Sequence, residues 1–277
     1  MNRKVWKTVN FNGRDITPEN LTNWGDLVPY KIIKELSKSE KLQPEDVFSV
    51  SNLHKNYKIY STGSIMPFTK SNSVVWGTGC IMPNAVGQKP KKVYAVRGPL
   101  TRQELLKRGW ECPELYGDPA LLYPKIYNPD IGKKYKMGII PHYIEYTSQD
   151  SMDIVRNLEN QGIRIINVCA GEEEFINELL ECEKIISSSL HGLIAADAYG
   201  IPNARVNISN KLTGGHFKFK DYYMSVGRPI DLGLQLTKNT KIDIIEGLYF
   251  NDNINIDLDK LFMSGPWNDP INKNIFY

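Results

Sequence analysis

The chain has 277 residues, of which 41% are hydrophobic and 23% are charged. This composition is typical of a globular protein, and the length fits two domains of roughly 120 residues each. Because 34 basic residues are balanced by 31 acidic ones, the net charge is only +3. The balance argues against a nucleic-acid binder that works through bulk positive charge, but not against a local pocket for an anionic substrate.

The four cysteines contain no Cys-x-x-Cys pair, which argues against a zinc site and favours buried thiols in a reducing compartment. The chain opens with no apolar stretch of signal-peptide length, and no run of 18 apolar residues occurs. We therefore expect a cytoplasmic protein that needs neither a metal ion nor a cofactor.

Short apolar runs alternate with amphipathic stretches along the chain, which indicates an α/β fold with crossover helices. In the first half, the pattern predicts helices over 27–37 and 99–107, and strands over 47–50, 58–60, 73–76 and 92–97. Residues 124–136 are rich in turn formers and charges, and we interpret them as an interdomain linker.

The same alternation resumes after the linker. It predicts helices over 152–161, 172–181 and 190–199, and strands over 136–140, 164–168, 184–188 and, as the last, 203–206. The expected architecture is two doubly wound, Rossmann-like domains facing across a cleft. Residues 1–128 would form the first domain and residues 129–241 the second, and the tail 242–277 would pack back on both.

Two glycine-containing segments are candidate ligand sites. Asn23-Trp-Gly25-Asp26 precedes a helix, where Gly25 permits close approach to a ligand and Asp26 is placed to cap the helix. Gly77-Thr-Gly79 follows a strand, at the edge of a sheet where substrates bind in α/β proteins. A plain capped helix and a simple turn are the alternative interpretations.

Arg97 ends a predicted strand and precedes a helix. A guanidinium at this edge suits a phosphate or a carboxylate, although a structural ion pair explains it equally well.

The strongest segment is Ser187-Ser-Ser-Leu-His191-Gly, which reads as strand, turn and helix. The helix dipole disfavours the charged form of His191, and a substrate phosphate would restore its affinity for a proton, so this histidine is a candidate general acid or base. The hydroxyls of Ser188 and Ser189 and the free amides of the turn would complete an anion-binding mouth. The alternative is a histidine held by a local hydrogen bond.

A basic segment follows the last predicted strand. It places Lys211, His216, Lys218 and Lys220 among aromatic residues beside a Gly-Gly pair. A mobile lid over an anionic donor and a solvated basic loop are both compatible with it. His142, at the end of another strand, is a second candidate histidine.

Together these segments resemble the polysaccharide pyruvyl transferase family, particularly its succinoglycan-pyruvylating members. The likeness covers about residues 20–225 and rests on the order and spacing of Asn23-Trp-Gly-Asp, Val96-Arg-Gly, Gly117-Asp-Pro, Ile140-Pro-His, Ser187-Ser-Ser-Leu-His-Gly and Asn210-Lys. It implies a two-domain fold like that of GT-B glycosyltransferases, phosphoenolpyruvate as the donor, and a lipid-linked saccharide acceptor at the inner face of the plasma membrane.

The family uses an Arg, a His and a Lys around the donor, and the matching positions here are Arg97, His191 and Lys211. Its usual Ser-x-Arg-Leu-His has Ser189 in place of the arginine in this chain, so Arg205 or Lys218 would supply the missing charge. In the expected mechanism His191 protonates the donor's methylene carbon and Asp26 accepts a hydroxyl proton. The predicted site comprises catalytic His191 and Asp26, donor-binding Arg97, Lys211, Ser188, Ser189, His142 and Lys218, and acceptor-binding Asn23, Gly25, Gly77 and Gly79.

Two rival functions remain open. A GT-B glycosyltransferase that uses a nucleotide sugar would share the fold, but no Glu-x-x-x-x-x-x-Glu pattern follows residue 184. A non-catalytic subunit of a polysaccharide assembly complex would have no need of Arg97 and His191 at sheet edges. The acceptor sugar and its linkage cannot be deduced from the residues.

Overall fold

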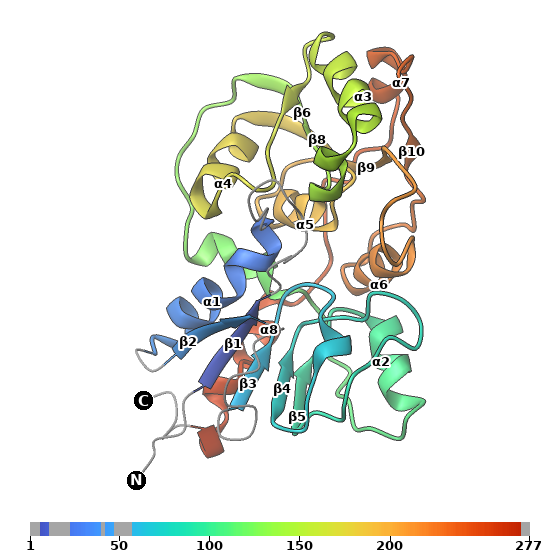
Figure 1. The fold of residues 1–277 in the computed structure, drawn as a ribbon. Coiled ribbons are helices and arrows are strands. Elements are labelled where there is room, and N and C mark those ends of the chain that lie inside the picture. The colour runs from blue at the N-terminus through green and yellow to red at the C-terminus, as the bar shows by residue number, and fades with distance from the viewer. Residues whose placement is uncertain (1–5, 11–22, 40–41, 47–56, 273–277) are drawn as a thin grey trace.

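A computed structural model of the chain describes residues 6–10, 23–39, 42–46 and 57–272. Within these residues the fold consists of two five-stranded parallel sheets with helices packed on them (Figure 1). The first sheet has the strand order β2-β1-β3-β4-β5, and the second has the order β10-β9-β8-β6-β7. The expected α/β class with parallel sheets is confirmed.

The first sheet is built from residues 6–95. Its strands are β1 (Trp6–Asn10), β2 (Leu42–Asp46), β3 (Tyr57–Tyr60), β4 (Ser73–Trp76) and β5 (Lys92–Ala95). Helices α1 (Trp24–Ser37) and α2 (Pro99–Leu106) belong to this half of the chain. Strand β4 is buried at all four positions, as expected for a parallel strand covered on both faces.

The second sheet is built from residues 135–235. Its strands are β6 (Tyr135–Ile140), β7 (Arg164–Ile165), β8 (Cys182–Ser187), β9 (Asn203–Asn207) and β10 (Leu234–Gln235). The helices of this half are α3 (Gln149–Glu159), α4 (Glu172–Leu180), α5 (Leu190–Ala198) and α6 (Phe217–Ser225).

Helix α5 is buried over residues 190–197. Its small residues make this possible. A Cβ on Gly192, for example, would stand 2.4 Å from the Oγ of Ser187, so only glycine lets the helix begin so close to the end of β8.

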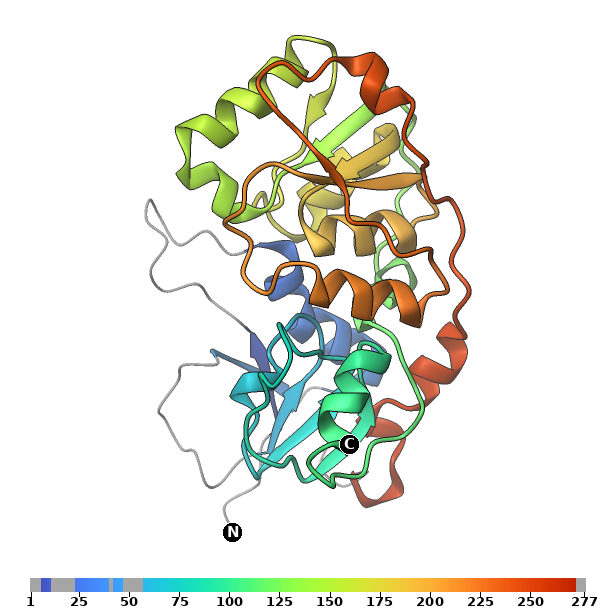
Figure 2. The same ribbon diagram turned by 90° about the vertical axis from the view of Figure 1, so that its right-hand side faces the viewer.

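The chain after β10 runs from the second sheet back to the first (Figure 2). It contains α7 (Ile242–Glu246) and α8 (Leu258–Met263). Asn251 forms a bridge with Asn203 of β9, and the Trp267 ring packs edge-on against Trp76 of β4, with ring centroids 4.8 Å apart. The short 3-10 helices are η1 (Met66–Phe68), η2 (Pro119–Lys125), η3 (Tyr143–Thr147), η4 (Pro266–Asn268) and η5 (Pro270–Asn272).

The structure corrects three predictions about elements. The strand at 203–206 is not the last, because β10 follows it. The strand expected over 164–168 is limited to two residues. The segment after β9 is not a loop throughout, since α6 begins at Phe217. The strand predicted over 47–50 lies outside the described residues. No helix in the described part of the chain is long and apolar enough to cross a membrane.

Candidate active site

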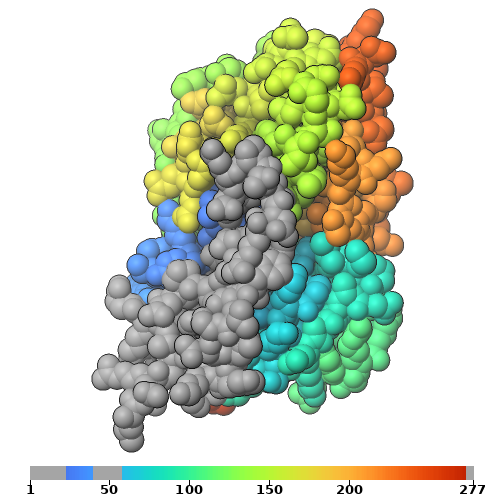
Figure 3. All heavy atoms as spheres, in the orientation of Figure 1, coloured from blue at the N-terminus to red at the C-terminus, as the bar shows by residue number. Residues whose placement is uncertain are grey.

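A pocket of about 480 Å³ lies where the two halves of the chain meet. Its walls come from the start of α1 and the loops after β3 and β4 on one side, and from the ends of β6 and β8 and the segment before and at the start of α6 on the other. In the space-filling view the segment around α6 lies directly against the first-sheet half (Figure 3). The lining residues are Asn23, Asp26, Ser64, Ile65, Pro67, Phe68, Ile81, Met82, Ala85, His142, Tyr143, Ile144, Ser189, Leu190, His191, Lys211, Thr213 and Lys218.

The start of α1 carries the first polar group of the pocket. Asn23 is the N-cap, because its side-chain oxygen accepts a hydrogen bond from the Gly25 amide at 3.0 Å. The Asn23 amide group also donates to the Asp26 carboxylate. The prediction that Asp26 caps the helix is therefore wrong. Asp26 lies in the first turn, and its carboxyl faces the pocket.

Gly25 makes room for the catalytic candidate of the other half. A Cβ at this position would stand 1.9 Å from Nδ1 and 2.1 Å from Cγ of His191. Any side chain would therefore overlap the imidazole ring. The close approach that the sequence assigned to a ligand is made by the histidine itself.

His191 is the second residue of α5 and is 9% exposed. Its Nε2 is buried and has no hydrogen-bond partner in the part of the chain that the structure describes. The N-cap, Ser189, makes no side-chain cap bond, so the first-turn amides of α5 lack both an intrahelical and a capping partner. An unpartnered imidazole beside free amides at a helix start is well suited to bind an anion.

The protonation of His191 is set by its surroundings. Burial and the positive charges of Lys218 and Arg97 lower the pKa of His191 from its usual 6.5 to about 3. At neutral pH the imidazole is therefore neutral in the free protein.

Lys218 is the main cation at the pocket. It projects from the first turn of α6 and is only 7% exposed. Burial and the positive charges of Arg97 and Arg205 lower its pKa to about 8. Among the described residues its ammonium makes no ion pair, and its Nζ lies 5.6 Å from the centroid of the Phe219 ring. An unpaired buried ammonium is costly and is well suited to receive an anionic ligand.

Asp26 is the second group with a strongly changed pKa. Burial raises the pKa of its carboxyl to about 8, although Lys218 and the hydrogen bond from Asn23 act in the opposite direction. The carboxyl is therefore mostly protonated near pH 7, the reverse of the state that a general base requires.

The other pocket residues predicted to bind the donor are less central. The Nδ1 of His142 accepts a hydrogen bond from the Ile144 amide at 3.3 Å, and burial, Lys218 and His191 hold its pKa well below the usual value. Lys211 lines the pocket from the exposed segment after β9. Ser188 does not line it. This buried residue instead accepts a hydrogen bond from the His142 amide at 2.9 Å.

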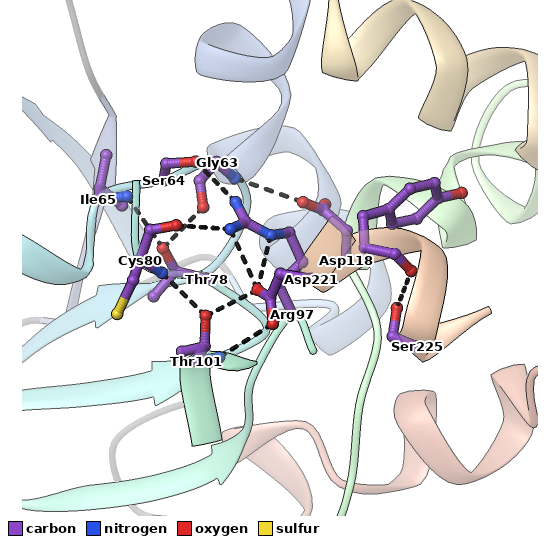
Figure 4. Close-up of polar contacts among 11 residues, drawn as sticks. Gly63, Ser64, Ile65, Thr78, Cys80, Arg97, Thr101, Asp118, Asp221 and Ser225 are labelled. Atoms are coloured by element: carbon purple, nitrogen blue, oxygen red, sulfur yellow. Dashed lines mark hydrogen bonds and ion pairs between the residues drawn. The ribbon is translucent and has the colours of Figure 1, made fainter. Parts of the chain in front are cut away.

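Arg97 lies behind the pocket wall and not in its lining. The guanidinium is fully buried and donates from Nε to Asp221 at 3.1 Å, from Nη1 to Ser64 at 2.6 Å and from Nη2 to the Cys80 carbonyl at 2.6 Å (Figure 4). Of these partners only Ser64 lines the pocket. Of the two roles that the sequence allowed for Arg97, the structure contains the structural ion pair. Arg97 reaches the pocket only through the Ser64 hydroxyl.

The glycines expected to approach the acceptor contact protein groups instead. A Cβ on Gly77, whose φ is +98°, would meet the Pro119 ring at 2.1 Å, and one on Gly79 would meet Cζ of Arg97 at 2.4 Å. Neither glycine lines the pocket. The alternative cation Arg205 stacks on the Phe219 ring, 3.7 Å from its centroid, and does not line the pocket either.

Among the residues that sequence reasoning missed are Ser64, Tyr143 and Asp221. Ser64 lines the pocket from the loop after β3, and Tyr143 lines it from the start of η3. Neither residue lies in a motif. Asp221 pairs with Arg97. The sequence places Asp221 three residues after Lys218, which is about one helical turn. That spacing would indicate a shared helix face only if the segment were predicted to be a helix.

Residues 88–210 match the family model described as polysaccharide pyruvyl transferase. The chain resembles this family over the matched region, which is less than half of its length. The matched region contains Arg97, His142 and His191, whereas Asp26 and Lys218 lie outside it. The similarity supports a transferase that acts in polysaccharide pyruvylation.

Two curated proteins are similar to this chain. The uncharacterized protein L143 of Acanthamoeba polyphaga mimivirus is 28% identical over 252 residues, which cover 86% of this chain and 84% of the relative. The succinoglycan biosynthesis protein ExoV of Rhizobium meliloti (strain 1021) is 26% identical over 148 residues, which cover 53% of this chain and 44% of that protein.

Proposed function

We propose that this protein transfers the pyruvyl group of phosphoenolpyruvate to two hydroxyl groups of one saccharide, forming a ketal. The observation that carries the proposal is the convergence of the His191 imidazole, the Asp26 carboxyl and the Lys218 ammonium on one pocket, from three different helices. The succinoglycan relative supports an acceptor that is a precursor of a surface or exopolysaccharide.

The donor carries about three negative charges, from its phosphate and its carboxylate. Lys218 and Lys211 would offset them, and the Ser189 hydroxyl and the first-turn amides of α5 would donate hydrogen bonds to the phosphate. In this arrangement Lys218 takes the place of the arginine that the family usually has at position 189. Arg97 would act from behind the wall, through Ser64.

The acid and base roles follow from protonation. The sequence assigned the acid to His191 and the base to Asp26, but the free protein holds the imidazole neutral and the carboxyl protonated. A bound trianion raises the pKa of both groups. The trianion therefore keeps Asp26 protonated. It also moves the pKa of His191 up towards 7, where a general base is most effective. We therefore assign the acid to Asp26 and the base to His191.

Under this assignment, both side chains return to their starting protonation states after one catalytic cycle. Asp26 protonates the methylene carbon, and a cationic centre forms at the carbon that bears the phosphate. The first sugar hydroxyl adds there and gives its proton to His191, which passes it to the departing phosphate as the carbon–oxygen bond breaks. The second hydroxyl adds to the same carbon, and its proton returns to Asp26. The products are the ketal and hydrogen phosphate, and both side chains regain their starting states.

The wider architecture is part of the proposal. A GT-B-like pair of domains, 1–128 and 129–241, would place the donor on the second domain and the acceptor on the first, near Asn23 and the apolar loops after β3 and β4. We further propose that the reaction occurs in the cytoplasm, on a lipid-linked acceptor at the inner face of the plasma membrane.

The donor is tested by thermal unfolding with added ligands. A ligand at 100 times its Kd stabilises a protein by about 2.7 kcal/mol, so phosphoenolpyruvate should raise the melting temperature, whereas UDP and GDP should not. His191→Ala should abolish phosphate release while preserving the fold, and His216→Ala, at an exposed histidine outside the pocket, serves as the matched control. Stabilisation by a nucleotide alone would favour the glycosyltransferase instead.

A further inference from the structure

Helix α6 is attached to both halves of the chain. On the side of the second sheet, the Tyr222 hydroxyl donates to Asp197 of α5 at 2.7 Å. On the side of the first sheet, the carboxylate of Asp221 is fully buried against Arg97 and Thr101. The helix therefore lies between the halves and its position depends on both attachments.

The Asp221 carboxylate uses both oxygens at the first-sheet half (Figure 4). Oδ2 accepts from Nε of Arg97 at 3.1 Å and from the Thr101 hydroxyl at 2.7 Å, and it lies 3.1 Å from Nη2 of Arg97. Oδ1 accepts from the Thr101 amide at 2.9 Å. Thr101 stands in the first turn of α2, whose N-cap is Gly98 and has no side chain. Asp221 thus supplies from α6 the acceptor that α2 lacks at its own start.

The backbone contact beside this carboxylate is equally close. A Cβ on Gly98 would stand 1.9 Å from the carbonyl oxygen of Asp221. Arg97-Gly98 therefore provides both the counter-ion and the space that α6 requires. This accounts for the Val-Arg-Gly segment without a direct contact between Arg97 and a ligand.

Lys218 precedes Asp221 by three residues, which is one helical turn. Lys218 is 7% exposed and makes no ion pair among the described residues. The Asp26 carboxyl would attract its charge when ionised, but its raised pKa leaves it mostly protonated near pH 7, so this attraction is weak. A buried ammonium without a counter-ion would gain free energy by moving into water. Something other than its own contacts must keep it in place.

We propose that Asp221 is a positioning residue: by docking α6 on Arg97 and Thr101, it holds the Lys218 ammonium in the pocket. The kinetic consequence rests on the proposed function, because it assumes that Lys218 binds the anionic donor. The structural consequence does not, because the exposure of the Lys218 amine can be measured without any substrate.

The first test is amine acylation of the intact protein, followed by mass spectrometry of each lysine. Lys220, which is exposed on the same helix, is the internal reference, and Lys218 should react at least tenfold more slowly. Asp221→Asn should bring the rate at Lys218 close to that at Lys220. Glu104→Gln, which alters another buried and ion-paired carboxylate on α2, should not. Slow labelling of Lys218 in folded Asp221→Asn would overturn the proposal.

Asp221→Asn leaves Arg97 buried without a counter-ion, which destabilises a protein. If that variant does not fold, Arg97→Met combined with Asp221→Leu removes both charges together, and the same labelling result is expected and decisive. Kinetics add a second test. Asp221→Asn should raise the KM for phosphoenolpyruvate about tenfold in the wild-type background and less than twofold in Lys218→Met. Equal effects in both backgrounds would show that Asp221 does not act through Lys218.

Discussion

Replacing Gly25 by alanine would put a methyl group into the space of the His191 ring. The added Cβ would lie 1.9 Å from Nδ1, whereas ordinary contacts begin near 3.4 Å, so the ring or the start of α1 must move by about 1.5 Å. A displacement of about 1 Å in a catalytic group costs on the order of 100-fold in rate. We expect Gly25→Ala to lower kcat by at least that factor.

The stability of this variant depends on two opposing effects. Alanine in place of a helical glycine contributes up to about 1 kcal/mol, and overpacking costs about 1–3 kcal/mol. The net change is a loss of no more than about 3 kcal/mol. Gly132→Ala, where an added Cβ meets nothing within 4 Å, is the matched control for both measurements.

The assay for this prediction is phosphate release from phosphoenolpyruvate with a saturating acceptor, beside a thermal melt. The reasoning is refuted if folded Gly25→Ala keeps kcat within twofold of the wild-type value. In the His191→Ala background the same substitution should no longer lower the melting temperature, because the ring with which it collides is absent.

Three further changes have definite expected outcomes. The kcat/KM should fall as the pH rises through about 8, because Asp26 then loses the proton it must donate and Lys218 loses its charge. Lys218→Arg should retain this decline if Asp26 causes it. A flat profile of kcat/KM up to pH 9 would contradict the assignment. Asp26→Asn should lower kcat by about 10²–10⁴-fold with phosphoenolpyruvate binding preserved in a thermal-shift titration, and a loss of binding alone would point to a structural role. Trp267→Ala should lower the free energy of unfolding by about 3–5 kcal/mol, because this buried ring packs on Trp76; denaturant titration measures this loss. The kcat of the folded variant should stay unchanged in steady-state kinetics.

Much of the fold could be predicted from local patterns. The apolar runs of β4, β6 and β8 and the small-residue helix after Ser189 identify their elements without tertiary information. His191 could be found for the same reason, since a strand, a serine turn and a helix start mark an anion-binding edge wherever they occur in an α/β chain.

The pocket's charge arrangement could not be predicted in this way. The Gly-Gly pair and the alternating Phe217-Lys-Phe-Lys220 suggest a loop, but burial of Phe219 and the pairing of Asp221 make the segment a helix. That pair joins residues 124 positions apart, and no local pattern contains such a contact. Burial likewise reverses the protonation of Asp26, because a pKa depends on the folded environment and not on the residue type.

The claim that the pocket binds phosphoenolpyruvate and transfers its pyruvyl group is tested most directly by one incubation. The protein is mixed with phosphoenolpyruvate and a panel of glycosides and lipid-linked oligosaccharides, and both released phosphate and product masses are followed. We predict that one acceptor gains one pyruvyl ketal for each phosphate released, and that His191→Ala yields neither product. Phosphate release without a pyruvylated sugar, or transfer from a nucleotide sugar in its place, would contradict the proposed function.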